Sequence, residues 1–419
     1  MTQSTPRQTP AQDTGSKPPR LAFVFILITL AIDAMGIGLI LPVLPDLISE
    51  LNGGTLGQAA IWGGVLSTSY AIMQFLCGPT IGSLSDRFGR RPVLLISLTV
   101  MALDYVVMAL AGSIWLLLAG RIVGGVAAAT QATATAFIAD ISKPEEKSKN
   151  FGLVGAAFGI GFVVGPLIGG VLGELGLRAP FYAAAALATF NLILGYYVLP
   201  ETVTDRIRRP FSWRRANPLG AFRHISALPG VRRYLTLFFL YEFAFFVYPA
   251  IWAYFTRAQF GWEPGMVGLS LGLFGVAIAV VQGGLIRWIL PTFGEARTIV
   301  YGFAFNFCAF LALATVTSGG MALILTPLTA LGAVVTPALQ GLMSRAAGED
   351  QQGELQGLVS SIRAVSAILS PLVMTQIFFL STDPAYGLNA PGAPFFLSMG
   401  LMALCLAIYL PARRPRVLA

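Results

Sequence analysis

Charged side chains are scarce in this sequence. Asp, Glu, Lys and Arg together make up 11% of its 419 residues, and 56% of the residues are hydrophobic. Soluble globular domains carry about 25% charged residues and are roughly half apolar. The shortage of charge, together with a mean hydropathy of +0.75, excludes an ordinary soluble domain and predicts a protein that lies in a membrane.

Histidine and cysteine are also rare, since the chain has one His and three Cys. Cys77, Cys308 and Cys405 fall in apolar segments with neither disulfide nor metal-ligand spacing, so we expect them to be small core residues. The sequence contains no Ser-His-Asp set, no metal-ligand cluster and no phosphate-binding loop. We therefore expect neither an enzyme nor a cofactor.

Long apolar runs are abundant. A helix needs about 20 apolar residues to cross a bilayer, and only helices and closed barrels satisfy their backbone polar groups there. An alternating barrel pattern is absent, so the runs predict helices. Twelve such runs begin near Leu21, Gln58, Pro92, Ile114, Asn150, Pro180, Arg232, Gly265, Thr298, Met321, Leu355 and Pro394.

The basic residues are distributed unevenly between the connections of these twelve helices. Of the 27 Lys and Arg residues, 23 lie in the two tails or in alternate connections on one side. The other four are Arg121, Arg178, Arg257 and Arg363. Cytoplasmic connections of membrane proteins are enriched in Lys and Arg. The pattern predicts that both termini are cytoplasmic, and that the net charge of +8 reflects orientation in the bilayer and not a nucleic-acid partner.

The two halves of the chain repeat each other. At a fixed offset of 205 residues, Gly78 matches Gly283, Phe88-Gly89 matches Phe293-Gly294, Gly152-Leu153-Val154 matches Gly357-Leu358-Val359, and Pro166-Leu167 matches Pro371-Leu372. A parallel repeat predicts an all-α membrane protein with twelve transmembrane helices in two pseudo-symmetric six-helix bundles. The expected parts are a disordered cytoplasmic tail (1–20), an N-terminal bundle (21–200), a cytoplasmic linker (201–230), a C-terminal bundle (231–411) and a cytoplasmic tail (412–419).

Three motifs resemble those of a known family. The charged stretch GSLSDRFGRRP (82–92) resembles the motif between the second and third helices of the major facilitator superfamily. GRIVGG (120–125) resembles its fourth-helix motif, and GFVVGPLIGG (161–170) its fifth-helix antiporter motif. At full length the chain resembles the tetracycline-exporter branch of the drug/proton antiporters, in DAMGIGLILPVLP (33–45), NFGLVGAAFG (150–159), PALQGLMSR (337–345) and QGELQG (352–357).

The resemblance implies a monomeric secondary transporter of the cytoplasmic (inner) membrane of a bacterium, working by alternating access. Its partners would be the lipid bilayer, protons and a small-molecule substrate. That substrate would be an amphipathic, tetracycline-like drug exported in exchange for protons. Two alternatives stay open. One is an exporter or exchanger of organic anions with the same fold, using Arg363, and the other is uptake by symport, which the antiporter motif disfavours.

The charged motif has a physical rationale at a cytoplasmic helix end. Asp86 can sit near the N-terminus of a helix from the other half, where the helix dipole favours an anion, and the arginines can hold helix ends and lipid phosphates. In the family this motif forms a latch that closes the cytoplasmic side; the alternative is an orientation signal alone. Pro291 stands where the repeat would place a second Asp86, so any latch is asymmetric. The predicted cytoplasmic gate comprises Gly82, Asp86, Arg87, Gly89, Arg90, Arg91 and Asp140.

The antiporter motif is rich in glycine at close to four-residue spacing, which lets helices touch. We expect both tight packing and a pliable seam that seals a cavity. Its residues are Gly161, Gly165, Pro166, Gly169 and Gly170.

Charged residues inside the apolar runs are functional candidates, because each costs at least about 2.5 kcal/mol on insertion scales. Asp33 is the leading candidate for carrying a proton or binding substrate charge, since Gly36 and Gly38 make its helix deformable. Asp104 is the second candidate for proton coupling, and Arg121 is expected to tune both acids. The alternative for either acid is a permanent pair with Arg121.

The second half departs from the tetracycline exporters, which carry a histidine in the eighth helix and an aspartate in the ninth for proton coupling. The matching positions are Ile278 and Asn306, neither of which titrates near neutral pH. Glu242 and Arg363 are present instead, either as a buried pair or with Arg363 facing an anionic substrate group. Aromatic residues of the seventh helix are available for stacking. The predicted substrate cavity comprises Asp33, Gln74, Arg121, Gln131, Glu242, Gln282, Asn306, Gln340 and Arg363.

Overall fold

The computed structural model describes residues 20–128, 130–204, 208, 210–211, 217–218, 220, 230–348 and 351–410. Every regular element in these ranges is helical. The predicted tails 1–20 and 412–419, except Arg20, and most of the predicted linker 201–230 lie outside the described residues.

The helices of the first half follow one another with short connections. They are α1 (Arg20–Ile40), α2 (Leu44–Asn52), α3 (Leu56–Phe88), α4 (Arg90–Ala109), α5 (Ile114–Ala128), α6 (Thr130–Ile141), the 3₁₀ helix η1 (Pro144–Glu146), α7 (Lys147–Leu175) and α8 (Ala179–Val198).

The second half contains eight α-helices within its described residues. They are α9 (Arg232–Phe245), α10 (Val247–Phe260), α11 (Pro264–Val280), α12 (Ile286–Thr315), α13 (Gly319–Thr329), α14 (Val335–Ala346), α15 (Gln352–Thr382) and α16 (Ala393–Tyr409). Short elements of other helix types are the π-helix η3 (Val281–Leu285) and the 3₁₀ helices η4 (Ala330–Val334) and η6 (Pro384–Tyr386).

These helices make twelve crossings of a membrane. Ten continuous helical segments in the described residues are long and apolar enough to cross, and one of them, Pro264–Thr315, has 52 residues. At 1.5 Å per residue it would be about 80 Å long, more than twice the roughly 30 Å core of a bilayer. Gly294 breaks it with φ 71° and ψ 155°, so it crosses twice, and α16 provides the last crossing. The twelve-helix prediction is confirmed.

The short helix α2 was not predicted, because its apolar residues look like a continuation of the first run. Pro42 and Pro45 separate α2 from α1, and Pro45 lies in the first turn of α2, where a missing N–H does no harm. The following helix α3 starts with a capping box in which Thr55 Oγ1 accepts from the N–H of Gln58, at 3.2 Å, and Gln58 Oε1 accepts from the N–H of Thr55, also at 3.2 Å.

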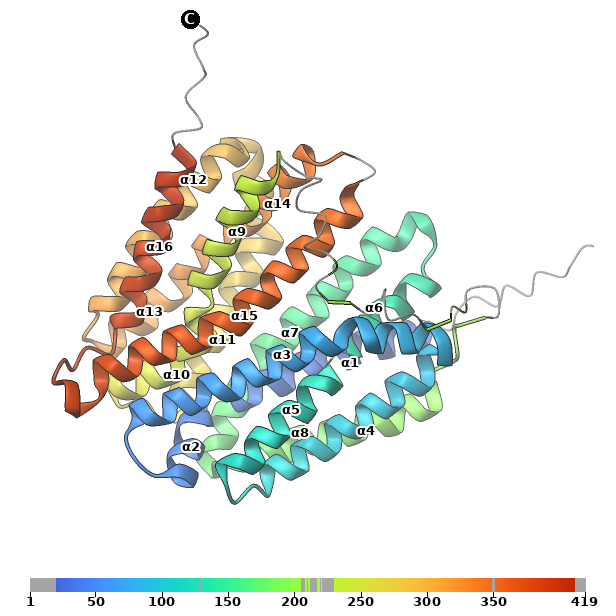
Figure 1. Ribbon diagram of the computed structural model, residues 1–419, viewed down its shortest axis with the longest axis horizontal. Helices are drawn as coiled ribbons and strands as arrows, with labels where there is room; N and C mark the ends of the chain where they lie inside the picture. The colour runs from blue at the N-terminus through green and yellow to red at the C-terminus, as the bar shows by residue number, and fades with distance from the viewer. Residues whose placement is uncertain are drawn as a thin grey trace, which may run out of the picture.

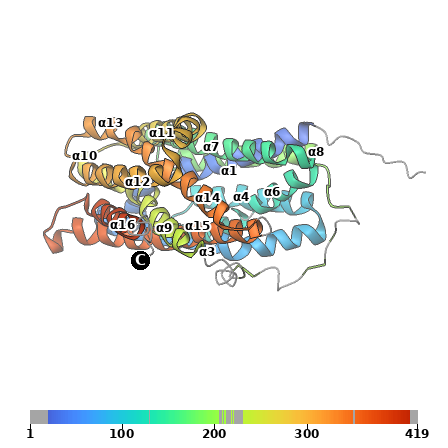
Figure 2. The same ribbon diagram turned by 90° about the horizontal axis from the view of Figure 1, so that it is seen from above.

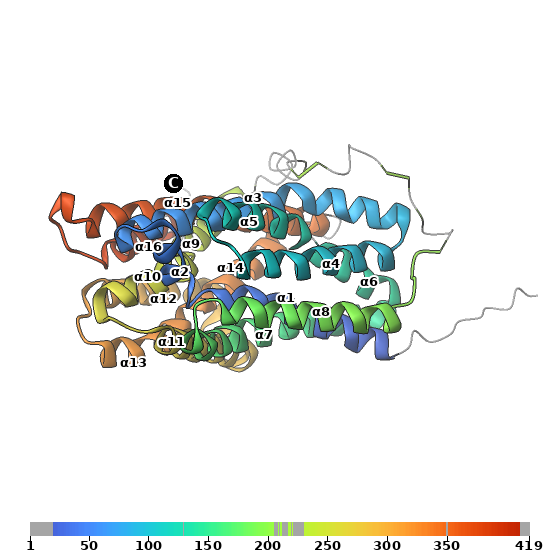
Figure 3. The same ribbon diagram turned by 90° about the horizontal axis from the view of Figure 1, so that it is seen from below.

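The two halves form two bundles that lie side by side. The blue-to-green helices and the yellow-to-red helices occupy separate regions in Figure 1 and, from above, in Figure 2. Contacts between the bundles come mainly from α7 against α11 and from α3 against α15, and Figure 3 shows α7 beside α11 from below. The predicted pair of six-helix bundles is confirmed.

Glycine allows the contact between α7 and α11. A Cβ atom added at Gly268 of α11 would lie 2.9 Å from the Cα of Gly170 on α7, and one at Gly275 would lie 2.6 Å from a methyl carbon of Val163. Real Cβ atoms do not approach other heavy atoms so closely, so larger residues would force the two bundles apart. Small residues at helix contacts serve this purpose in membrane proteins.

The bundles meet at one end and separate at the other. We call the end that carries Asp46, Arg178 and Arg257 the α2 end, and the end that carries Asp86 and Arg90 the Arg90 end. At and near the α2 end several polar contacts join the bundles: Thr55 Oγ1 to Asp383 Oδ2 at 3.4 Å, Thr68 Oγ1 to the Ile368 carbonyl at 2.9 Å, the N–H of Gly265 to Glu174 Oε1 at 2.9 Å, and Arg257 to Asp46 at 3.2 Å.

Among the described residues, no hydrogen bond or ion pair joins the bundles at the Arg90 end. Arg90 there contacts residues of the first bundle, and Arg345 contacts Glu295 of the second. In the described residues, polar contacts therefore join the bundles at the α2 end and not at the Arg90 end.

Cross-linking tests the closed α2 end. A Cβ atom at Gly57 would lie 3.0 Å from Oγ1 of Thr382 in the other bundle, which is close enough for a disulfide. In a variant whose three native cysteines are replaced by Ala, we expect Gly57→Cys with Thr382→Cys to form a disulfide under mild oxidation. Protection from a maleimide mass tag measures it. Gly82→Cys with Arg345→Cys, at the Arg90 end, is the control pair, and equal cross-linking of both pairs would contradict the structure.

Candidate functional site

A buried acid and an arginine meet inside the first bundle. Asp104 of α4 is 3% exposed, and its Oδ2 lies 3.7 Å from Nη2 of Arg121 on α5. The Arg121 guanidinium also stacks over the ring of Tyr70, 5.3 Å from its centroid, and contacts Sδ of Met108 at 2.6 Å. Within the described residues, both carboxylate oxygens of Asp104 lack a hydrogen bond. Because buried ions are costly unless paired closely and hydrogen-bonded, this is an incompletely satisfied pair.

The glycines of GRIVGG make room for that carboxylate. A Cβ atom at Gly120 would lie 2.9 Å from Oδ1 of Asp104, and one at Gly124 would lie 2.5 Å from Oδ2. These positions are one turn apart on the face of α5 that packs against α4. The absence of side chains there lets Asp104 lie between the two helices.

Asp33 lies near this pair. It is half-buried on α1, and in the described part of the chain it makes no hydrogen bond or ion pair. Tyr70 and Tyr105 each interact electrostatically with Asp33, Asp104 and Arg121. The structure therefore brings the three predicted proton-coupling residues into one cluster around two tyrosines.

The two tyrosines were not singled out from the sequence. Tyr105 directly follows Asp104, and its hydroxyl packs against Gly36, one turn from Asp33. The deformable glycine beside Asp33 thus also provides the space for Tyr105. Tyr70 gave no comparable signal, because it is an isolated aromatic residue in an apolar run.

Glu242 of α9 and Arg363 of α15 pair in the second bundle, but the pair is not the buried one that the sequence suggested, because Arg363 is exposed. Nε of Arg363 lies 3.5 Å from Oε1 of Glu242, and the Thr336 hydroxyl donates to the same oxygen at 3.4 Å. The guanidinium also stacks over Phe238 at 5.4 Å. The Glu242 side chain is 17% exposed and that of Arg363 is 46% exposed, so Arg363 keeps an open face.

The uncharged candidates for the substrate cavity differ in exposure. Gln131 and Gln282 are exposed, and Gln74 and Gln340 are half-buried. Asn306 is 0% exposed and donates through Nδ2 to the carbonyls of Gly302, at 2.8 Å, and Gly332, at 3.0 Å. Asn306 therefore ties α12 to η4, and in this conformation its side chain faces no open space.

The predicted gate residues form a network around Arg90. Its Nη1 lies 2.7 Å from Asp86 and 2.6 Å from Ser85 Oγ, and its Nε lies 3.1 Å from Asp140. Arg87 stacks over the neighbouring ring of Phe88 at 5.0 Å. In this conformation Asp86 pairs within its own bundle and not with a helix N-terminus of the other.

Glu201 joins this network and was missed. The N–H groups of Arg90 and Arg91, at the start of α4, donate to its carboxylate at 2.9 and 3.2 Å, where the helix dipole favours an anion. Gly89, with φ 109°, makes the sharp turn before α4 and packs against Glu201. Gly82 contributes its carbonyl, which accepts from Ser85 Oγ at 2.8 Å. No sequence pattern pointed to Glu201 as a gate residue, because only the fold brings residue 201 close to residue 90.

The antiporter motif lies between α1 and α11. Gly161, Gly165 and Gly169 face the α1 backbone, where added Cβ atoms would meet the carbonyls of Ala31, Met35 and Leu39. Gly170 faces α11 instead, and Pro166 packs against Gly38 of α1 and Gly268 of α11. The motif thus forms the expected tight packing on one side and the contact between bundles on the other.

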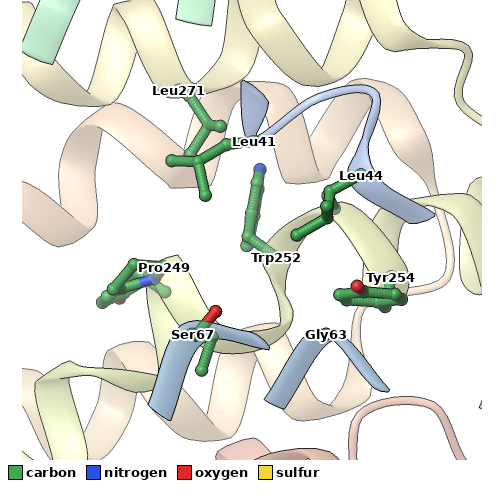
Figure 4. Close-up of a pocket in the computed structure, with 11 residues that line it drawn as sticks. Leu41, Leu44, Gly63, Ser67, Pro249, Trp252, Tyr254 and Leu271 are labelled. Atoms are coloured by element: carbon green, nitrogen blue, oxygen red, sulfur yellow. The ribbon is translucent and has the colours of Figure 1, made fainter. Parts of the chain in front are cut away.

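A narrow pocket lies between the bundles near the α2 end (Figure 4). It has room for only one or two water molecules and is lined by Leu41, Leu44, Gly63 and Ser67 of the first bundle and by Tyr248, Pro249, Ala250, Trp252, Ala253, Tyr254 and Leu271 of the second. The hydroxyl of Tyr254 is buried and has no hydrogen-bond partner among the described residues. The pocket is therefore a tightly closed contact in this conformation.

Within the described ranges, no group of three or more His, Cys, Asp or Glu residues is arranged to hold a metal ion.

Known proteins resemble this chain over most of its length. The sequence profile of the Major Facilitator Superfamily matches residues 26–371. The class C tetracycline resistance protein of Escherichia coli is 42% identical over 88% of this chain and 92% of its own, and the class G protein of Vibrio anguillarum is 38% identical over 86% and 91%.

Solved structures agree with this relationship. The crystal structure of a human organic anion transporter is 25% identical, with a TM-score of 0.68 over 94% of this chain and 100% of that one. The match of fold, the three motifs and the high identity over nearly the whole chain have one common explanation. The chain belongs to the Major Facilitator Superfamily of membrane transporters, within the branch of the tetracycline resistance proteins.

Proposed function

We propose that this transporter exports an amphipathic, tetracycline-like compound in exchange for protons, across the cytoplasmic membrane of a bacterium. The observation that carries the proposal is the 42% identity to a tetracycline resistance protein over 88% of the chain. Asp33, Asp104 and Arg121 lie together in the first bundle and supply titratable and charged groups for the exchange.

Asp33 is the proposed proton carrier. It is half-buried and has no ion pair in the described residues, whereas Asp104 lies beside Arg121. An acid without a fixed cation partner can exchange its proton for a substrate contact without first breaking an ion pair. This division lets Arg121 and Asp104 set the electrostatic field in which Asp33 works.

The two bundles are the proposed moving bodies. The glycine contact of α7 with α11 and the contact of α3 with α15 are where they would rock. In this proposal the bundles span 21–200 and 231–411, joined by the linker 201–230. Substrate would enter from the Arg90 end and leave at the α2 end.

An organic-anion exporter is the second candidate. The Arg363 side chain is 46% exposed although it pairs with Glu242, so it can meet an anionic substrate group. A human organic anion transporter shares the fold at 25% identity. In this case Arg363 and not Asp33 would decide which compounds are carried.

Replacing Asp33 tests the proposed carrier. We expect Asp33→Asn to abolish proton movement opposite to a tetracycline gradient, because the amide cannot carry a proton. The measurement uses purified protein in liposomes with a pH dye inside. Glu50→Gln, which removes a carboxylate outside the apolar runs, should transport normally. Unchanged exchange in Asp33→Asn would contradict the assignment, and transport of an aromatic anion that depends on Arg363 would favour the second candidate.

A glycine substitution tests the position of Asp104. Gly124→Ala should push the Asp104 carboxylate away from Arg121 and reduce exchange on the order of tenfold, the effect of about 1.4 kcal/mol. The control is Gly155→Ala on α7, where an added Cβ meets nothing within 4 Å. Equal activity of the two variants in the liposome assay would show that the placement of Asp104 does not matter.

A charge swap tests the Glu242–Arg363 pair. Glu242→Arg and Arg363→Glu alone each place two like charges together and should impair transport. The double variant restores an attractive pair and should recover a large part of the activity. If the double variant stays as inactive as the Arg363 single variant, Arg363 acts on the substrate and not through Glu242.

A further inference from the structure

One ion pair joins the two bundles, and it is the only such pair in the described residues. Oδ1 of Asp46, on α2 of the first bundle, lies 3.2 Å from Nε of Arg257, on α10 of the second. Nη1 of the same guanidinium lies 2.8 Å from Oε1 of Glu263, just before α11. Two carboxylates from opposite bundles therefore share one guanidinium where the α2 end is closed.

The two carboxylates differ in their access to water. The Asp46 side chain is 19% exposed, and that of Glu263 is 62% exposed. Burial raises the pKa of the Asp46 carboxyl, the Arg257 guanidinium lowers it, and the Glu263 carboxylate raises it, so that the pKa stands above its ordinary value. The attraction of the shared guanidinium is thus smaller than the free-energy cost of burying the Asp46 charge.

Among the described residues, Arg257 is the only cation paired with Asp46. On the same helix, Glu50 pairs with Arg178 at 3.2 Å. Besides α10, the helices packed against α2 are α3 and α5. The first charged residue of α3 is Asp86, near its far end, and that of α5 is Arg121, in the middle of the helix.

The α10 side adds one neutral titratable group. Tyr254 lies one turn before Arg257 and interacts electrostatically with Asp46. Its hydroxyl packs against Gly63 of α3 and has no hydrogen-bond partner. When the α2 end is closed, Asp46 therefore lies near the aromatic residue Tyr254 and has one paired cation, Arg257.

The direction of the pH effect follows from the burial of Asp46 and from the sharing of Arg257 with Glu263, which together outweigh the attraction of the guanidinium. A carboxyl that binds its proton more tightly when the bundles are closed than when it faces water favours closure as pH falls. Opening the α2 end separates Asp46 from α10 and exposes it to water. A protonated Asp46 then gives up its proton to water more readily.

We propose that Asp46 is a proton-binding residue of a gate at the α2 end, where proton uptake accompanies closure of the bundles and proton release accompanies opening. The proposal rests on the proton-coupled export proposed above and adds a second step that protons control. With the α2 end outside, as the basic residues predict, external acid would promote the return of the transporter after it has released its substrate.

Distance measurements between the bundles test the proposal without substrate or transport. Asn52→Cys and Leu388→Cys place spin labels at exposed positions on the two bundles, in protein whose native cysteines are replaced by Ala and which is held in nanodiscs. Pulsed electron paramagnetic resonance then reports closed and open populations at pH 5.5 and pH 8. We expect the ratio of open to closed to rise by roughly fivefold at the higher pH, at the low end of typical coupling between linked sites.

Substitutions show whether Asp46 or another titrating group causes the pH dependence. Asp46→Asn should remove the pH dependence and favour the closed form, whereas Glu50→Gln on the same helix should leave the shift intact. Arg257→Gln should increase opening at pH 8, and Arg257→Gln with Asp46→Asn should close again, which a misfolded protein would not do.

The proposal is overturned if the open-to-closed ratio of the parent protein does not change with pH, or changes in the opposite direction. It is also overturned if the change in Asp46→Asn is as large as in the parent. None of these outcomes depends on whether tetracycline is carried, so a failure here is distinguishable from a failure of the proposed function.

Discussion

The close approach of α7 to both α1 and α11 is the constraint on which the rest of the structure depends. Gly161, Gly165 and Gly169 bring α7 against the α1 backbone, while Gly170 brings it against α11. In a bilayer, helices associate through packing and not through the hydrophobic effect, so small residues decide which surfaces meet. The same helix therefore fixes α1, which carries Asp33, and forms the contact at which the two bundles join.

Charge is used sparingly and in a different way at each depth. At the Arg90 end, Arg90 gathers Asp86 and Asp140 within one bundle, so the network stays intact while the bundles are apart. In the middle of the first bundle, Asp104 and Arg121 form a loose pair near Asp33, which has no ion pair in the described part of the chain. At the α2 end, Arg257 bridges the bundles. Only this last arrangement has to break when the bundles separate there.

Much of the fold was predictable because the bilayer limits the alternatives. Apolar runs of helical length, the basic residues and the internal repeat indicate twelve helices in two bundles. The break at Gly294 falls in the predicted connection between the eighth and ninth helices, which carries Arg287 and Arg297. The break at η4 was not predictable, since it interrupts a run that remains apolar throughout. The short helix α2 was missed for the same reason.

For the candidate site, the sequence alone determined which charged residues lie at membrane depth, because their cost in an apolar run makes them conspicuous. Only the tertiary structure decided their partners: Asp104 with Arg121, Arg90 with Asp140, Arg257 with Asp46, and the start of α4 with Glu201. Periodicity places a residue along one helix, but a partner is set by how two helices distant in the chain pack. That packing depends on glycines whose role is visible only when the neighbouring backbone is in place.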